Sequence, residues 1–222
     1  MTTEVTVRSE TKTPDPAPAR RPWVLHPAIR VGFALLVAGL FAASYAMPLW
    51  VSRFVAPQYP YGLNLYVYLD HVEGDTFEVD LLNHYVGLRP IEQMACTERK
   101  YALGMLVVVC LAAVVASIFP KSLWQVLFVL PLILFPLGML LDLTAWLYYA
   151  GHSLDPDSAL GMSVKPFTPK LIGTQKIANF DVTSSLGSGT YLQLAAALLL
   201  ACAAGVGWRL SRRRKISGAS TC

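Results

Sequence analysis

The chain has 222 residues, of which 55% are hydrophobic and only 14% are charged. A soluble domain usually carries about a quarter of charged residues, so this composition argues against one. The formal net charge is +4, but the basic residues flank apolar blocks. We interpret the excess as a signal for membrane orientation rather than as a nucleic-acid-binding surface.

Four apolar blocks are long enough to cross a bilayer, which takes about 20 residues in a helix. We predict transmembrane helices at residues 28–50, 101–119, 123–149 and 191–208. Trp and Tyr side chains near the block edges fit the two membrane interfaces. The third block contains Pro131 and Pro136, each of which removes a helix hydrogen bond and predicts a kink. The predicted fold class is therefore an all-α membrane protein with four transmembrane helices.

The end of the first block allows a second interpretation. Ser44-Tyr45-Ala46 is a small-x-small pattern that resembles a signal-peptidase site. Cleavage after Ala46 would leave three membrane helices and an outward N-terminus. We favour an uncleaved helix, because a long polar segment precedes the block and Pro48 follows the pattern closely.

Basic residues lie mainly at the two ends of the chain. Arg20 and Arg21 precede the first block, and the last block is followed by Arg212, Arg213, Arg214 and Lys215. Because basic residues near membrane helices tend to stay in the cytoplasm, we predict that both termini are cytoplasmic. Residues 1–27 then form a disordered, proline-rich cytoplasmic tail, and residues 209–222 form a basic one.

This orientation places residues 51–100 and 150–190 outside the membrane as an extracytoplasmic cap. In the first loop, apolar residues alternate with polar ones over 63–70 and 77–82, around a Glu73-Gly74-Asp75 turn. This alternation predicts a β-hairpin whose apolar face packs on the second loop or on a partner. The second loop is rich in Gly, Ser, Thr and Pro and shows no periodicity, and long loops of this kind are often functional.

Asp142 is the one acidic residue inside a predicted membrane helix. A charge at mid-membrane costs about 2.5–3.5 kcal/mol, so such a residue usually faces the bundle interior, a cavity or a partner. Proton handling, ion coordination and substrate docking are the functional interpretations. A protonated acid, or an acid paired with Arg53 or with a loop residue, is the structural alternative.

Candidate metal ligands occur in the outer loops. Imidazole, thioether and thiolate groups suit copper, and the candidate site consists of His84, Met94, Cys96 and His152. No tight ligand motif is present, so scattered polar and packing residues are the alternative interpretation. The cysteines form no outward pair, which argues against a disulfide framework. No nucleophile, cofactor motif or carboxylate pair stands out, so we do not expect an enzyme.

Several segments resemble a known family. They are residues 46–50, 56–63 and 166–169 and, above all, Leu82-Asn83-His84-Tyr85-Val86-Gly87. They are similar to segments of uncharacterised bacterial four-span membrane proteins encoded near genes for nitrous-oxide reductase maturation and other copper proteins. The resemblance implies the bacterial inner (cytoplasmic) membrane, an accessory role near its outer face and a connection with copper. It also favours His84 as a ligand.

These observations lead to one predicted function and two alternatives. We predict a membrane accessory or assembly protein that acts on an exported metalloprotein, with copper as the candidate cofactor. Its partners would be the lipid bilayer and an extracytoplasmic or membrane protein. The first alternative is a structural subunit of a larger membrane complex. The second is a small transporter that uses Asp142.

Overall fold

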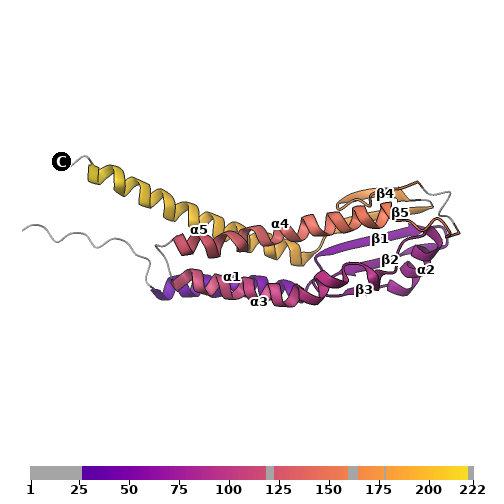
Figure 1. Ribbon diagram of the computed structural model, residues 1–222, viewed down its shortest axis with the longest axis horizontal. Helices are drawn as coiled ribbons and strands as arrows, with labels where there is room; N and C mark the ends of the chain where they lie inside the picture. Colours follow the sequence, from indigo (N-terminus) through magenta and orange to yellow (C-terminus); the bar gives the residue numbers. More distant parts are fainter. Residues whose placement is uncertain (1–26, 119–122, 160–164, 178, 220–222) are drawn as a thin grey trace, which may run out of the picture.

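The computed structural model describes residues 27–118, 123–159, 165–177 and 179–219. Figure 1 shows the long helices at one end of the molecule and the strands at the other. In chain order the elements are α1 (Pro27–Tyr45), β1 (Trp50–Ala56), β2 (Tyr59–Val67), β3 (Val72–Gly74), α2 (Thr76–Val86), the short 3-10 helix η1 (Ile91–Gln93), α3 (Cys96–Ile118), α4 (Leu123–His152), β4 (Gly173–Ile177), β5 (Phe180–Leu186) and α5 (Ser188–Ala219).

The predicted all-α fold class is wrong. The strands form one five-stranded antiparallel sheet in the order β3-β2-β1-β5-β4, so the fold is mixed α/β. The four-span prediction is also wrong. Within the described residues, three helices are long and apolar enough to cross a membrane: Ala28–Tyr45, Val129–His152 and Ser188–Gly205. Helix α3 differs from these three helices because its first turns contain the charged residues Glu98, Arg99 and Lys100.

The four long helices form a ring in which each contacts two neighbours. Helix α1 packs on α3 and α5, and α4 packs on the same two helices. The buried core of this bundle takes side chains from all four helices, among them Phe41, Val109, Leu132 and Ala196. Helix α1 begins and α5 ends at the end of the molecule remote from the sheet (Figure 1).

A buried polar contact joins α1 and α5 near the sheet. Gln193 and Ser44 are 1% and 0% exposed. Gln193 Nε2 donates a hydrogen bond to Ser44 Oγ over 3.0 Å, and Ser44 Oγ donates to the Phe41 carbonyl over 2.7 Å. A small hydroxyl side chain at position 44 therefore lets the two helices approach closely while its polar atom stays satisfied.

The predicted β-hairpin is wrong in its second strand, because residues 76–86 form helix α2. Apolar side chains in this segment alternate, but Val79, Leu82 and Val86 also recur at the spacing of one helix face, and this second pattern prevails. Gly87 ends the helix in the left-handed conformation, with φ at 88°. In this loop β2 pairs with β1 before it, in a register that places Trp50 opposite Val67, and with the short β3 after it, where Leu65 lies opposite Gly74.

The second outer loop contains two strands that the sequence did not reveal. Strand β5 pairs with β1 in antiparallel register, and β4 pairs with β5. Val182 and Ser184 are buried, whereas Asp181 and Thr183 between and beside them are exposed, so β5 alternates like any half-buried strand. The two outer loops are thus joined by pairing of β1 with β5 in one sheet, and not by packing of an apolar hairpin face on the second loop.

A hydrogen-bonded cluster fixes the turn between β2 and β3 to the end of α1. Asp70 accepts hydrogen bonds from the Tyr45 hydroxyl over 2.8 Å and from His71 Nδ1 over 2.6 Å. Burial alone would raise the pKa of Asp70, but the bonds from His71 and Tyr45 outweigh burial and lower that pKa. The His71 ring also stacks on Tyr68, with 4.5 Å between ring centroids.

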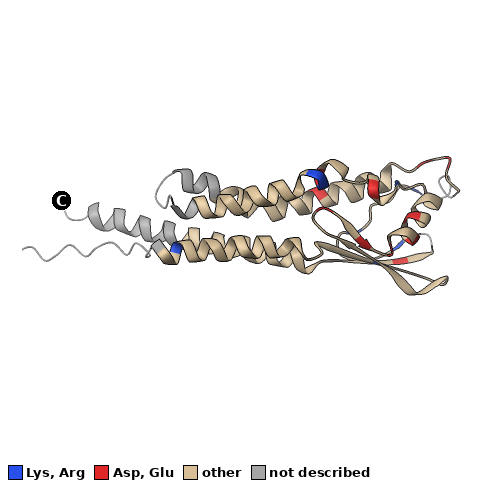
Figure 2. Cartoon of the chain, turned by 90° about the horizontal axis from the view of Figure 1, so that it is seen from below, with Lys and Arg blue, Asp and Glu red and all other residues tan. Residues whose placement is uncertain are grey.

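Charged side chains gather at the sheet end, and long stretches of the helices between the two ends carry none (Figure 2). The basic residues from which we predict the orientation of the chain in the membrane cannot be placed against the fold. Arg20 and Arg21 lie outside the described residues, as does the predicted tail before Pro27, and the side chains of Arg212, Arg213, Arg214 and Lys215 are not described.

Candidate functional site: an apolar cavity between the sheet and the bundle

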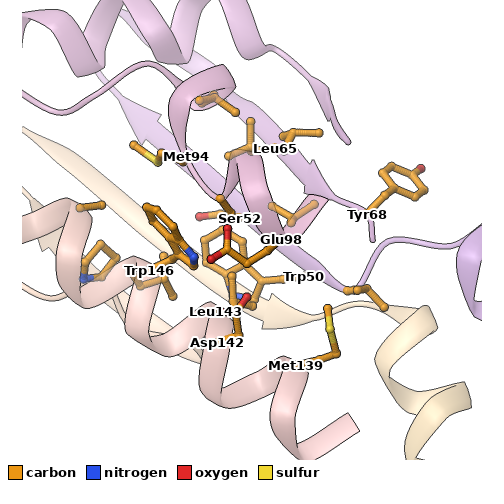
Figure 3. Close-up of a pocket in the computed structure, with 18 of the residues that line it drawn as sticks. Trp50, Ser52, Leu65, Tyr68, Met94, Glu98, Met139, Asp142, Leu143 and Trp146 are labelled. Atoms are coloured by element: carbon orange, nitrogen blue, oxygen red, sulfur yellow. The ribbon is translucent and has the colours of Figure 1, made fainter. Parts of the chain in front are cut away.

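A cavity of about 630 Å³ lies between the inner face of the sheet and helices α2, α3 and α4 (Figure 3). This volume is within the range of about 300–1,000 Å³ that is usual for small-molecule sites. Nearly all of its lining side chains are apolar. They come from segments between Leu49 and Thr190, so the cavity exists only in the folded chain.

Helix α4 forms the longest wall of the cavity. It has 30 residues and is therefore about 45 Å long, more than a membrane requires. Its lining residues run from Pro131 to Ala150, both within the stretch that is apolar enough to cross a membrane. Leu143 and Leu147 pack on the sheet core around Trp50. The cavity thus lies between the stretch of α4 that is apolar enough to cross a membrane and the face of the sheet.

The two prolines of α4 have different surroundings. Pro136 is among the fully buried side chains, which indicates a packing role in the bundle. Pro131 lines the cavity at its bundle end. Between them and the sheet, α4 contributes Gly138, whose missing side chain leaves open space.

The sheet side of the cavity is apolar because its polar atoms are already bonded. The Trp50 indole N–H donates to the Leu171 carbonyl over 2.8 Å. The hydroxyls of Ser52 and Ser184 are 3.1 Å apart and bond to one another. A ligand on this side would therefore meet hydrocarbon and indole surface rather than free donors or acceptors.

Arg99 fixes the turn that forms another edge of the cavity. Its Nη2 donates to the carbonyls of Ile91 (2.6 Å), Glu92 (3.1 Å) and Met94. The turn includes Ala95, which has φ at 52° in the left-handed region that disfavours a non-glycine residue. Ile91, Met94 and Ala95 all line the cavity, so the guanidinium group holds a strained wall segment in place.

Two carboxylates face the cavity from neighbouring helices, Glu98 from α3 and Asp142 from α4 (Figure 3). They interact electrostatically with each other. Among the hydrogen bonds of the described residues, none ends on either carboxylate. The predicted alternative partner of Asp142 is engaged elsewhere, because Arg53 donates to the Tyr61 carbonyl over 2.9 Å. Asp142 thus faces a cavity, one of the three environments that its position in the sequence suggested.

The four predicted copper ligands have separate surroundings. His84 is exposed in the last turn of α2, and Met94 lines the cavity. Cys96 is exposed and its Sγ donates to the Glu92 carbonyl, whereas His152 stacks on Tyr148 with its Nδ1 2.9 Å from the Tyr148 carbonyl. In the part of the chain that the structure describes, no three His, Cys, Asp or Glu side chains cluster as a metal site would require. Copper binding by this set stays a prediction.

The segments that carry the family resemblance have clear structural roles. The Asn83-His84-Tyr85-Val86-Gly87 stretch ends α2, and the Gly87 carbonyl accepts a hydrogen bond from the Asp155 N–H over 2.8 Å. Residues 166–169 run along the end of α4, where the Phe167 N–H donates to the Gly151 carbonyl over 3.1 Å. Both segments help to fasten the second loop over the cavity.

No protein-family model matches this sequence, and no curated protein matches it significantly. The predicted family therefore remains a prediction. Of the site residues, the sequence singled out Asp142 and Met94 but missed Glu98, which reads there as an ordinary charged residue before an apolar block. Only the fold brings its carboxylate to face that of Asp142.

Proposed function

We propose that this protein is a membrane-anchored binding protein that holds the apolar chain of a lipid-like amphiphile. The observation that carries the proposal is the continuous apolar cavity, which reaches from the membrane-spanning part of α4 to the sheet. A chain entering from the bilayer would stay in apolar surroundings along this path. Burial contributes about 0.8 kcal/mol for each methylene, so a long chain would bind strongly without polar contacts.

The proposed role is accessory rather than enzymatic. The residues around the cavity supply shape and apolar surface, and the Trp50 indole, the Ser52 hydroxyl and the Arg99 guanidinium are engaged within the protein. A protein of this kind holds or presents an amphiphile for a partner. We further propose that the sheet lies on the outer side of a bacterial cytoplasmic membrane, as the distribution of basic residues favours.

Tryptophan fluorescence tests this proposal, because Trp50 and Trp146 both line the cavity. A variant in which Trp23, Trp124 and Trp208 are replaced by phenylalanine keeps only these two of the five tryptophans. It would be placed in bilayers whose phospholipids carry bromine at the ends of their acyl chains. If chains enter the cavity, the bromine atoms contact the indoles and quench most of the emission.

The control places a single tryptophan on the outer face of the same helix. Tyr148 is 56% exposed, does not line the cavity and lies close to Trp146 in α4, towards the end of the stretch that could cross a membrane. Tyr148→Trp, in a background with the other tryptophans replaced, reports ordinary lipid at a similar height, remote from the chain ends at the centre of the bilayer. Equal quenching at both places, or no quenching of Trp50 and Trp146, would show that chains do not enter the cavity.

A further inference from the structure

The carboxylates of Glu98 and Asp142 belong to the same cavity but differ from the rest of its wall. One comes from the first turns of α3 and the other from the middle of the α4 wall. Neither accepts a hydrogen bond from the described residues, whereas Ser52 and Asn83 along the cavity are hydrogen-bonded within the protein. Glu98 is exposed and Asp142 is partly buried, so the pair lies where solvent reaches the apolar cavity. A cation between the two carboxylates would relieve their mutual repulsion.

The charges nearby leave this acidic pair without a matching cation of the protein. The closest basic side chain along the cavity is Arg99, and its guanidinium is bonded to three carbonyls of the 91–94 turn. No salt bridge to Glu98 or Asp142 forms within the described residues. The wall of the cavity is therefore hydrocarbon along most of its length and acidic at one place.

We propose that the ligand of this cavity is an amphiphile with an amine headgroup, whose ammonium lies between Glu98 and Asp142 while its chain fills the apolar part. This inference rests on the proposed function and adds the chemical class of the headgroup. Ammonium donates up to three hydrogen bonds, and bonds between ionised groups are about twice as strong as neutral ones. A carboxylate headgroup would be repelled by the same two residues.

The test is a competition experiment with the full-length protein in uncharged lipid nanodiscs. A fluorescent reporter with a neutral acyl chain is displaced by a long-chain alkylamine, by the alcohol or by the fatty acid of the same chain length. We expect the amine to bind about tenfold more tightly than the alcohol, because two partly exposed ion pairs together supply roughly that factor. The fatty acid should bind more weakly than the alcohol. A short-chain amine should not displace the reporter, which separates an amphiphile from a free amine.

Matched variants assign the preference to the two carboxylates. Glu98→Gln and Asp142→Asn, singly and together, should reduce the preference for the amine and leave the affinity for the alcohol nearly unchanged. Asp181→Asn removes an exposed carboxylate of β5 that does not line the cavity and should retain the preference.

The possible outcomes separate this inference from the proposed function. Equal affinities of the wild type for amine, alcohol and acid would overturn the amine headgroup while chain binding stands. A preference that survives in the double variant would overturn the assignment to Glu98 and Asp142. A reporter that does not bind at all would overturn the proposed function itself. The wild-type comparison of the three ligands decides the inference even where a variant folds poorly.

Discussion

Replacement of Gly187 by alanine is expected to destabilise the protein by about 3 kcal/mol, at the upper end of the usual cost of overpacking. A Cβ atom at this position would lie 2.0 Å from the carbonyl oxygen of Pro48. The obstacle is backbone and not the end of a flexible side chain, so one of the two segments must move. The link between β5 and α5 would separate from the link between α1 and β1.

That movement would break a set of hydrogen bonds at the junction of sheet and bundle. The Gly187 N–H donates to the Leu49 carbonyl over 2.8 Å, and the Thr190 hydroxyl donates to the same carbonyl over 2.7 Å. The Gly189 N–H donates to the Pro48 carbonyl over 2.9 Å. The pairing of β1 with β5 begins immediately beyond, where Trp50 lies opposite Leu186.

Thermal unfolding in detergent, followed by tryptophan fluorescence, measures this effect. The melting temperature should fall by roughly 6–12 °C, since each kcal/mol corresponds to about 2–4 °C in a chain of this size. Gly39→Ala is the matched control, because a Cβ at Gly39 in α1 meets nothing within 4 Å and alanine favours a helix. A melting temperature for Gly187→Ala equal to that of Gly39→Ala would contradict the tight junction.

Filling the cavity from α4 is expected to have the largest effect on binding. Gly138 lines the cavity, and a Cβ added there meets nothing within 4 Å, so a leucine side chain can extend into the space that a ligand chain would occupy. Exclusion of even two methylenes of the ligand costs about 1.6 kcal/mol, which is more than a tenfold loss of affinity. Gly138→Leu should therefore bind the acyl-chain reporter at least tenfold more weakly.

Gly104→Leu is the matched control for this change. Gly104 lies in α3, a Cβ there also meets nothing within 4 Å, and the residue does not line the cavity. Both substitutions replace a helix-interior glycine by a better helix former, so they change helix stability in the same direction. Equal reporter affinities for the two variants, both correctly folded, would contradict the location of the binding site.

The sequence indicated the long helices well because their signal is local. Runs of apolar residues identify α1, α4 and α5 without knowledge of the rest of the chain. The sequence could not indicate how α3 differs, because its apolar run resembles the others and the charged residues before it were assigned to a loop. The length of the apolar run exceeds one membrane crossing and predicts tilt or a protruding end, but the sequence could not show that α4 packs on the sheet.

The outer segments were harder to predict because their patterns are short and ambiguous. In α2, the apolar residues satisfy a period of two and a helical period together, and only packing on the sheet decides between them. Strands β4 and β5 lie in a segment rich in Gly, Ser and Thr, where strand signals are weak. The first strand, β1, begins at Trp50, which seemed to end a membrane helix.

The cavity could not be predicted at all, since no contiguous segment encodes it. Its two carboxylates, Glu98 and Asp142, come from different helices. On its sheet side, Ser52 bonds to Ser184, which lies far along the chain. The intramembrane position of Asp142 was the one useful sequence signal, because an acid among apolar residues indicates a cavity or a partner.

Photo-crosslinking with a phospholipid that carries a diazirine at the end of one acyl chain tests the central claim most directly. The protein would be irradiated in bilayers, and the labelled residues would be located by peptide mass spectrometry. We expect label on cavity-lining residues such as Trp50, Met139 and Leu143. Label confined to outward residues such as Leu141 and Leu198, which are 72% and 65% exposed, would show that lipid only surrounds the protein and would contradict a chain-binding cavity.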